Sequence, residues 1–306
     1  MSVVATTSGS GRDTIDYTDD LRLAHVLADD ADSISTDRFK AIDLHVMSKP
    51  DLTPVTDADQ AVEESIRRTL SRSRSRDAVT GEEQGTTGAV PGGRGQRRWI
   101  IDPIDGTKNF VRGVPVWATL ISLAVDDEVV LGVVSAPMLQ RRWWASLGNG
   151  AWTGRSLLKA SRCQVSDVRR IEDASLSYSS VHGWEERGQL DDMVALMRRC
   201  WRTRAYGDFW SYMLLAEGAV DIAAEPDLEV HDMAALDIIV REAGGTFTSL
   251  DGTDGPWGGN ALATNGHLHD TALSFLGAMA DDDGDPDAPS TGPGSVSELR
   301  PRGPRA

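Results

Sequence analysis

The sequence predicts a protein of the α+β class, and three observations support this prediction. The chain has 306 residues, 40% of them apolar and 25% charged, which is typical of a globular protein with a substantial core. Apolar runs rich in β-branched residues, such as residues 99–101 and 118–124, indicate buried strands. Apolar residues at helical spacing, as between residues 21 and 34, indicate helices interspersed with those strands.

The formal charge of −16 limits the classes of function. It argues against a nucleic-acid-binding protein, because such proteins draw much of their affinity from basic contacts to phosphates. A negative field also repels a bare phosphate ester, so a phosphate site in this chain needs bound cations. The same field favours a substrate that carries a positive group.

The cysteines and the hydropathy of the chain indicate its compartment. Cys163 and Cys200 are far apart and lack metal-ligand spacing, so we expect reduced thiols. No apolar stretch of ~18 residues and no signal-peptide pattern is present. We therefore expect a cytoplasmic protein that binds neither a membrane nor nucleic acid.

The first third of the chain predicts two helices and a loop. Residues 1–13 are small and polar, and we expect them to be disordered. A packing helix follows from residue 14, and a second helix starts at Thr56, which with Asp59 forms a capping-box-like pattern. Capping alone explains both residues, and a catalytic role for Asp59 is equally open. Residues 71–98 carry arginines without interleaved aromatics, which favours a solvated mobile loop over a binding patch.

Residues 99–110 are the stretch around which the chain is organised. The strand ends at Asp102 and Asp105, whose carboxylates can point into one crevice and need a cation to stay charged together. Oxygen ligands favour Mg²⁺, with Mn²⁺ as a substitute. Gly106 and Thr107 then offer backbone N–H groups at a helix start, where a phosphate is stabilised. A plain turn is the alternative, since Pro103 and Gly106 suit turn positions.

The rest of the chain alternates strands and helices. We expect paired strands at residues 118–124 and 129–135, an irregular polar segment at 155–170, and a strand at 174–180 followed by a helix at 191–200. A helix from about residue 208 to 218 and a strand at 219–224 present Asp208 and Glu225, which also fit as a helix cap and a surface charge. Asp232 opens a helix that ends near Gly244, and residues 281–306 should form a disordered tail.

The strand at residues 141–144, Arg-Arg-Trp-Trp, has three possible roles. It could form a binding surface, but packing at a sheet face or at a subunit interface is favoured, since Trp and Arg are common interface anchors.

Three blocks resemble the signature blocks of the inositol monophosphatase-like, metal-dependent sugar-phosphatase superfamily. They are GEE at residues 81–83, WIIDPIDGTKNF at residues 99–110 and HDMAALDIIVREAGG at residues 231–245. The resemblance covers about residues 15–278 and implies one catalytic domain, residues 14–280, with the layered αβαβα fold of that superfamily. It also implies two or three Mg²⁺ ions held by Glu82, Asp102, the carbonyl of Ile104, Asp105 and Asp232.

The same resemblance implies the catalytic roles. The positions of Thr107 and Asp59 match the pair that orients and deprotonates the attacking water, and Glu83 is expected to support catalysis beside Glu82. The amides of Gly106 and Thr107 are expected to hold the phosphate. One position departs from the pattern, because His231 stands where the family usually has Trp, and we expect it to pack or to contact Asp232.

Three further segments, residues 49–63, 110–123 and 204–226, are most similar to the histidinol-phosphate phosphatases of actinobacteria. This resemblance implies hydrolysis of L-histidinol phosphate in histidine biosynthesis, with Arg204, Asp208 and Glu225 in the substrate pocket, and a homodimer. An inositol monophosphatase or a broader sugar or nucleotide 3′-phosphatase is the competing enzyme. A regulatory protein that binds a phosphorylated ligand without hydrolysing it is the alternative outside enzymes.

Overall fold

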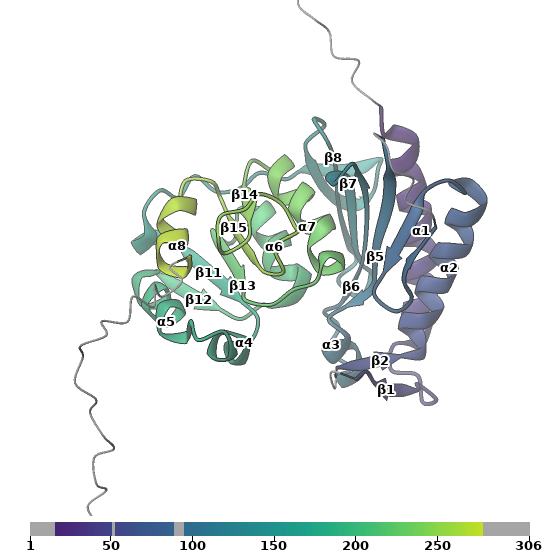
Figure 1. Ribbon diagram of the computed structural model, residues 1–306, viewed down its shortest axis with the longest axis horizontal. Coiled ribbons are helices and arrows are strands. Elements are labelled where there is room, and N and C mark those ends of the chain that lie inside the picture. The colour runs from purple at the N-terminus through teal and green to yellow at the C-terminus, as the bar shows by residue number, and fades with distance from the viewer. Residues whose placement is uncertain (1–15, 51–52, 89–94, 278–306) are drawn as a thin grey trace, which may run out of the picture.

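The computed structural model describes residues 16–50, 53–88 and 95–277. The expected disordered segments, residues 1–13 and 281–306, lie outside the described residues. Helices and sheets alternate in five layers, as Figure 1 shows from right to left: two helices, a large sheet, two helices, a smaller sheet and three helices. The predicted layered α+β fold is therefore confirmed.

The first layer consists of α1 (Thr18–Arg38) and α2 (Asp57–Ser73), which pack against each other and against the large sheet. Thr56 is the N-cap of α2 and forms the predicted capping box with Asp59. Buried residues of both helices join Trp99, Ile101 and Val133 of the sheet in one hydrophobic cluster. A short hairpin, β1 (Val46–Ser48) and β2 (Pro54–Thr56), connects the two helices.

The large sheet has eight strands in the order β10-β9-β8-β7-β6-β5-β3-β4. Its strands are β3 (Ala78–Gly81), β4 (Gly85–Thr87), β5 (Arg97–Asp105), β6 (Ala118–Val125), β7 (Glu128–Ala136), β8 (Arg141–Ser146), β9 (Ala151–Ser156) and β10 (Lys159–Arg162). β3 runs parallel to β5, and the other neighbours are antiparallel. The predicted pair at residues 118–124 and 129–135 is confirmed as β6 and β7.

Two segments are more regular than we expect from the sequence. Residues 78–81 form a strand rather than part of a mobile loop, because Ala78 and Val79 are buried where β3 pairs with β5. Residues 155–170 contain the end of β9 and all of β10, which pair at the edge of the sheet. These strands are short, and β10 is also polar, so only their partners make them recognisable.

The strand at residues 141–144 is β8, in the interior of the large sheet. Trp143 and Trp144 are 0% and 3% exposed, so their indole rings already pack within one protomer. The expected packing at a sheet face is confirmed, and the suggestion that these two tryptophans contact a second subunit is wrong.

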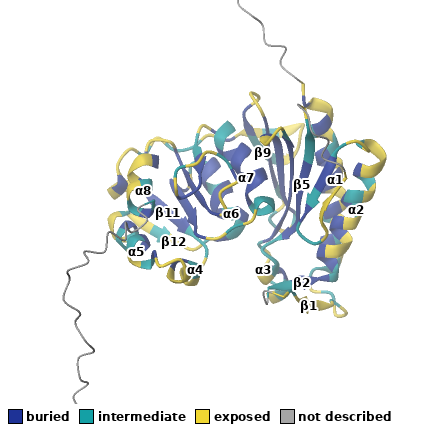
Figure 2. Ribbon diagram, viewed as in Figure 1, coloured by how far each residue is buried: buried dark blue, intermediate teal, exposed yellow. Residues whose placement is uncertain are grey.

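The middle layer is formed by α6 (Asp208–Ala216) and α7 (Val230–Glu242), which lie between the two sheets and contact each other. Buried residues of both helices contact the large sheet on one side and β13 to β15 on the other in the largest hydrophobic cluster. Figure 2 shows these two helices mostly in the colour of buried residues. An apolar helix between two sheets is buried on nearly all sides, which explains why α7 has eight buried residues among its thirteen.

The smaller sheet has the order β12-β11-β13-β15-β14 and combines parallel and antiparallel pairs. Its strands are β11 (Ser175–Tyr178), β12 (Arg202–Arg204), β13 (Ile222–Glu225), β14 (Thr246–Thr248) and β15 (Ala261–Thr264). The outer layer is formed by α4 (Val181–Glu186), α5 (Leu190–Arg199) and α8 (His269–Leu276). A separate hydrophobic cluster joins these helices to the outer face of the sheet.

The remaining elements are short helices. α3 (Thr107–Arg112) follows β5, and two 3₁₀ helices span Pro137–Leu139 and Ile171–Asp173.

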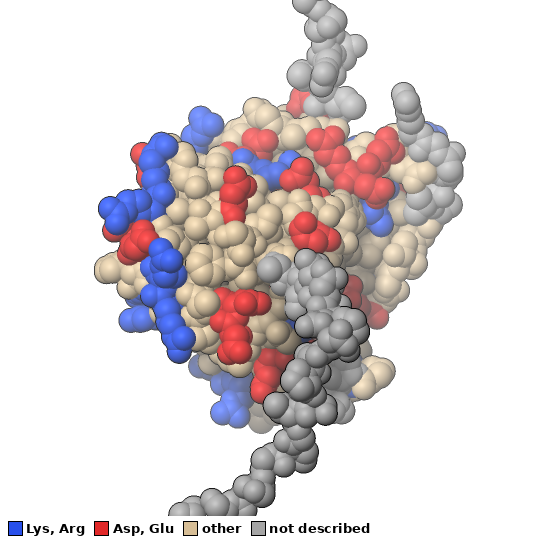
Figure 3. Space-filling model, turned by 60° about the vertical axis from the view of Figure 1, so that its left-hand side comes forward, with Lys and Arg blue, Asp and Glu red and all other residues tan. Residues whose placement is uncertain are grey.

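The surface charge is unevenly distributed. On the face in Figure 3, basic side chains gather along one side and acidic side chains spread over the middle. Within the described ranges, no helix is both long and apolar enough to cross a membrane.

Candidate active site

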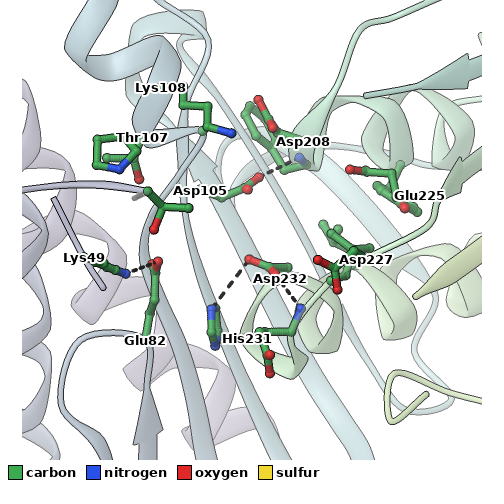
Figure 4. Close-up of a pocket in the computed structure, with 18 residues that line it drawn as sticks. Lys49, Glu82, Asp105, Thr107, Lys108, Asp208, Glu225, Asp227, His231 and Asp232 are labelled. Atoms are coloured by element: carbon green, nitrogen blue, oxygen red, sulfur yellow. Dashed lines mark hydrogen bonds and ion pairs between the residues drawn. The ribbon is translucent and has the colours of Figure 1, made fainter. Parts of the chain in front are cut away.

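A cavity of about 560 Å³ lies where the large sheet, the β1–β2 hairpin and the middle helices meet. One wall comes from the ends of β3 and β5 and the start of α3, and the opposite wall comes from α6, β13 and the start of α7. Figure 4 shows the charged side chains of both walls. The lining residues are Lys49, Thr53, Pro54, Glu82, Asp105, Gly106, Thr107, Lys108, Asp208, Phe209, Tyr212, Glu225, Asp227, Leu228, Glu229, His231, Asp232 and Leu236.

Three predicted carboxylates gather in one cluster, of which Asp105 and Asp232 line the cavity. Asp102 and Asp105 lie at the end of β5, Asp232 lies in the first turn of α7, and one oxygen of each lies within 4.8 Å of the other two. The pairing of β5 with β6 shifts between Asp102 and Asp105, where Pro103 cannot donate a backbone hydrogen bond. This irregularity lets two aspartates three residues apart face the same point.

The three carboxylates repel one another. Burial, followed by the nearby charges of Glu82 and Asp105, raises the pKa of Asp102 well above its usual value. Burial raises the pKa of Asp105 as well, although the backbone N–H of Phe209 donates to Asp105 Oδ2 at 2.6 Å. Asp102 Oδ1 is buried and accepts no hydrogen bond from the described residues.

This arrangement fits a divalent cation. Carboxylates that are crowded together and repel one another are stable only when a positive charge joins them or when they take up protons. Carboxylate oxygens are the ligands of Mg²⁺ and related hard ions. The buried, unpartnered Asp102 Oδ1 is the observation that supports this fit most directly.

A second acidic cluster lies next to the first. Asp59, Glu82 and Glu83 each place one carboxylate oxygen within 4.8 Å of the others. Lys49 Nζ lies 2.5 Å from Glu82 Oε1 and 2.8 Å from Glu83 Oε1, as Figure 4 shows for Glu82. Although burial opposes the charged ammonium group, these two contacts raise the pKa of Lys49.

Asp59 and Thr107 lie side by side. Asp59 Oδ2 accepts hydrogen bonds from the backbone N–H of Thr56 at 2.8 Å and from its hydroxyl at 2.5 Å. Its other oxygen, Oδ1, lies 3.4 Å from Thr107 Oγ1. The Thr107 hydroxyl is also 2.9 Å from the carbonyl oxygen of Ile104, so its single proton serves one acceptor at a time. Burial raises the pKa of Asp59 to about 6.

Gly106 makes the sharp turn between β5 and α3. Its φ of 85° is in the left-handed region, and a Cβ there would lie 3.2 Å from Asp208 Oδ2 and 3.2 Å from the Val116 carbonyl oxygen. A residue without a side chain is therefore required at this position. The turn places the Gly106 and Thr107 segment in the cavity wall beside Asp105.

The opposite wall is also acidic. Burial raises the pKa of Asp208 to about 6, and Asn109 Nδ2 donates to Asp208 Oδ2 at 3.1 Å. Burial raises the pKa of Glu225 to about 8. Glu225 and Tyr212 are both buried, and the side chains of Ser179 and Tyr212 lie close enough to the Glu225 carboxylate to act on its pKa. Polar side chains that line a cavity favour a polar ligand at this wall.

The structure separates Arg204 from the other predicted residues. Arg204 lies on β12, an edge strand of the smaller sheet, and its side chain is exposed and does not line the cavity. A contact between Arg204 and the substrate stays a prediction. His231 does line the cavity, with Nε2 3.7 Å from Asp232 Oδ1, in agreement with the expected contact.

The sequence alone indicates no role for several lining residues, among them Lys49, Tyr212, Asp227 and Glu229. Asp227 and Glu229 follow Glu225 within four residues, and this acidic run could have indicated that they lie at the same site. Lys49 and Tyr212 lie in two segments that carry the resemblance, residues 49–63 and 204–226, but only the fold brings the β1–β2 hairpin and the buried face of α6 to the cavity.

Comparisons with known proteins agree with this geometry. The model of the inositol monophosphatase family matches residues 16–277. A histidinol-phosphatase of Streptomyces coelicolor is 62% identical over 265 residues, which cover 85% of this chain and 98% of the relative. A histidinol-phosphatase of Mycobacterium tuberculosis is 58% identical over 260 residues, with coverage of 85% and 98%.

Among solved structures, the extragenic suppressor protein suhB of Bartonella henselae is similar over 85% of this chain and 98% of its own. The TM-score is 0.76 and the sequence identity is 28%. The family match, the two close relatives and the shared fold agree, and the chain therefore belongs to the inositol monophosphatase family.

Proposed function

We propose that this protein is a magnesium-dependent phosphomonoesterase that hydrolyses L-histidinol phosphate to L-histidinol and phosphate, a step of histidine biosynthesis. The cluster of Asp102, Asp105 and Asp232 at the cavity is the observation that carries the phosphatase chemistry. Similarity at 62% and 58% identity to two histidinol-phosphatases, over nearly their full length, supports the substrate.

The metal-binding residues in this proposal are Glu82, Asp102, the carbonyl of Ile104, Asp105 and Asp232, which would hold two or three Mg²⁺, or Mn²⁺ in its place. When bound, such ions neutralise phosphoryl oxygens, lower the pKa of water and stabilise a leaving alkoxide.

The protein's own residues position the reactants. The Thr107 hydroxyl orients the attacking water, and Asp59, which lies 3.4 Å from that hydroxyl, takes up the proton. Glu83 keeps the acidic cluster in place through Lys49. The amides of Gly106 and Thr107 hold the phosphate in line with the water, so no covalent enzyme intermediate is needed.

The acidic wall supports the choice of substrate. Histidinol carries an ammonium group and an imidazole ring, and the partly buried Asp208 and the buried Glu225 are the acids that face them in this proposal. A positive substrate also offsets the repulsion that the chain's charge of −16 exerts on a phosphate ester.

A phosphate-release assay in Mg²⁺ tests the substrate. We expect kcat/KM for L-histidinol phosphate to exceed that for inositol 1-phosphate and for adenosine 3′,5′-bisphosphate by at least about 100-fold, because neither competitor carries a cationic side chain. A preference for either competitor would make the enzyme an inositol monophosphatase or a nucleotide 3′-phosphatase on the same machinery.

Three substitutions test the roles of the two walls. Asp105→Asn is expected to lower kcat by about 10³-fold or more, because it removes a metal ligand. Asp208→Asn and Glu225→Gln are expected to raise KM for histidinol phosphate about 10-fold or more while kcat changes less. Equal small effects of all three would contradict these roles.

A ligand-binding protein without activity is the alternative outside enzymes. Calorimetry that detects histidinol phosphate binding in excess Mg²⁺, without phosphate release, would favour that alternative. The proximity of Thr107 to Asp59 argues against it, since a pure binding protein has no need of a pair that handles water.

We also propose that the protein acts in the cytoplasm as a homodimer. The two cysteines are both free, as expected in a reducing compartment. The mass of the particle in solution, measured by light scattering, tests the dimer.

A further inference from the structure

The turn that carries Glu82, which lines the cavity, and Glu83 follows β3 and is hydrogen-bonded to helix α2. Glu63 of α2 is 0% exposed, and both of its carboxylate oxygens point at this turn. Oε2 accepts from the backbone N–H of Glu83 at 2.8 Å, and Oε1 accepts from the backbone N–H of Gln84 at 3.0 Å. One buried carboxylate therefore fixes two consecutive peptide groups immediately after Glu82.

Arg67, one helical turn further along α2, extends this connection. Its Nε donates to Glu63 Oε1 at 2.7 Å, and its other nitrogens donate to the Val79 carbonyl, the Thr87 hydroxyl and the Gly85 carbonyl. The guanidinium group thus neutralises the buried carboxylate and binds both β3 and β4. Charge-assisted hydrogen bonds of this kind are among the stronger polar contacts in proteins.

Gly81 explains how the carboxylate reaches the turn. A Cβ on Gly81 would lie 2.4 Å from the carboxyl carbon of Glu63, closer than any real contact. The absence of a side chain at Gly81 thus leaves the space that the Glu63 carboxylate fills.

We propose that Glu63 is a positioning residue that sets the affinity of the site for Mg²⁺ by holding the Glu82–Glu83 turn against α2. This inference rests on the proposed function, because it takes Glu82 as a metal ligand. Glu63 has no part in the chemistry and does not line the cavity. Residues that orient metal ligands typically change metal affinity about 10- to 100-fold when they are replaced.

The structure suggests a substitution that keeps the shape of the side chain. In Glu63→Gln one acceptor oxygen becomes an NH₂ group, which must face a backbone N–H or the Arg67 guanidinium group and cannot accept from either. Glu64→Gln is the matched control, because Glu64 is the next residue of α2, is exposed, and pairs with Arg68 at the same spacing of four residues.

Gly81→Ala tests the same contact without removing the charge. The added methyl group pushes the flexible end of Glu63 away from the turn while Asp102, Asp105 and Asp232 stay unchanged. The proposal requires Gly81→Ala and Glu63→Gln to have the same effect on Mg²⁺ binding.

Calorimetric titration of the metal-free protein with Mg²⁺, without substrate, is the deciding measurement. We expect the Kd for Mg²⁺ to rise about 10- to 100-fold in Glu63→Gln and Gly81→Ala and to stay at the wild-type value in Glu64→Gln. We also expect activity at saturating Mg²⁺ to show wild-type KM for the substrate and kcat within about three-fold of wild type.

The outcomes separate this inference from the proposed function. Wild-type Mg²⁺ affinity in both Glu63→Gln and Gly81→Ala would overturn the positioning role, even if their melting temperatures fell. An absence of Mg²⁺ binding in the wild-type protein would overturn the proposed function itself. If Glu63→Gln does not fold, the same Mg²⁺ titration of two other single variants, Gly81→Ala and Arg67→Gln, tests the positioning role. Arg67→Gln removes the hydrogen bonds from α2 to β3 and β4.

Discussion

His25 is a buried histidine that the active site does not use. It packs edge-on against Trp144, with 4.9 Å between ring centroids, and its Nδ1 lies 3.3 Å from Arg142 Nη1. Burial, and then the charge of Arg142, lowers the pKa of His25 to about 4. The folded protein therefore holds His25 neutral at a pH where the unfolded chain would protonate it.

This residue predicts an acid sensitivity of stability. Between pH 6.5 and 4 the unfolded state binds more protons at His25 than the folded state, so the free energy of unfolding falls as the pH falls. The loss between pH 7 and pH 5 is about 2 kcal/mol. We expect urea unfolding to show that the fall in the free energy of unfolding from pH 7 to pH 5 is about 2 kcal/mol smaller in His25→Gln than in wild type. His182→Gln, on the surface of α4, should show the same fall as wild type.

At the scale of elements, α7 connects the core to the site. It contacts β7 of the large sheet and β14 of the smaller one, and its first turn carries Asp232. Gly132 of β7 allows the close approach, since a Cβ there would lie 2.7 Å from Ile238 Cγ2 and 2.9 Å from the Ala235 carbonyl oxygen. The position of Asp232 thus depends on a glycine in a distant strand.

We predict that Gly132→Ala lowers the free energy of unfolding by about 1–3 kcal/mol, because the methyl group meets the backbone of α7, which cannot move without leaving the sheet. The same displacement should weaken Mg²⁺ binding. Urea unfolding and Mg²⁺ titration check the two effects, with Glu128→Ala at the exposed end of β7 as the control. An unchanged free energy of unfolding in Gly132→Ala would contradict the close packing of α7 against β7.

At the scale of the whole molecule, the cavity joins two halves of the chain. Asp102 and Asp105 belong to the large sheet, whereas Asp232 belongs to a helix that follows the smaller sheet's β13. Burial and then the neighbouring acidic charges, Asp232 among them, raise the pKa values of Asp102 and Asp105, so without a cation the carboxylates repel across the junction. A bound cation should therefore stabilise the fold as a whole.

We predict that Mg²⁺ at about 100 times its Kd raises the free energy of unfolding by about 2.7 kcal/mol. Asp102→Asn should be more stable than wild type when both are metal-free at pH 7, since it removes one of the repelling charges, and should lose most of the response to Mg²⁺. Thermal unfolding in Mg²⁺, and in NaCl at equal ionic strength, distinguishes specific binding from screening. A wild-type response in Asp102→Asn would exclude this cluster as the metal site.

Much of the protein could be predicted from its sequence because the signals are local. The apolar run of β5, the capping box of Thr56 and Asp59 and the helix whose first turn carries Asp232 follow from neighbours within a few residues. The aspartates of the central motif were recognisable as candidates because two carboxylates three residues apart are unusual next to a buried strand.

The sequence by itself determined the class of the fold, the family and the residue types of the site. The tertiary structure decided what local patterns could not: that β3 is a strand, that Lys49 faces Glu82, that Trp143 is internal and that Glu63 holds the turn beside the site. The physical reason is that each of these depends on a partner far along the chain. Burial and pairing across such distances arise only when the layers pack together.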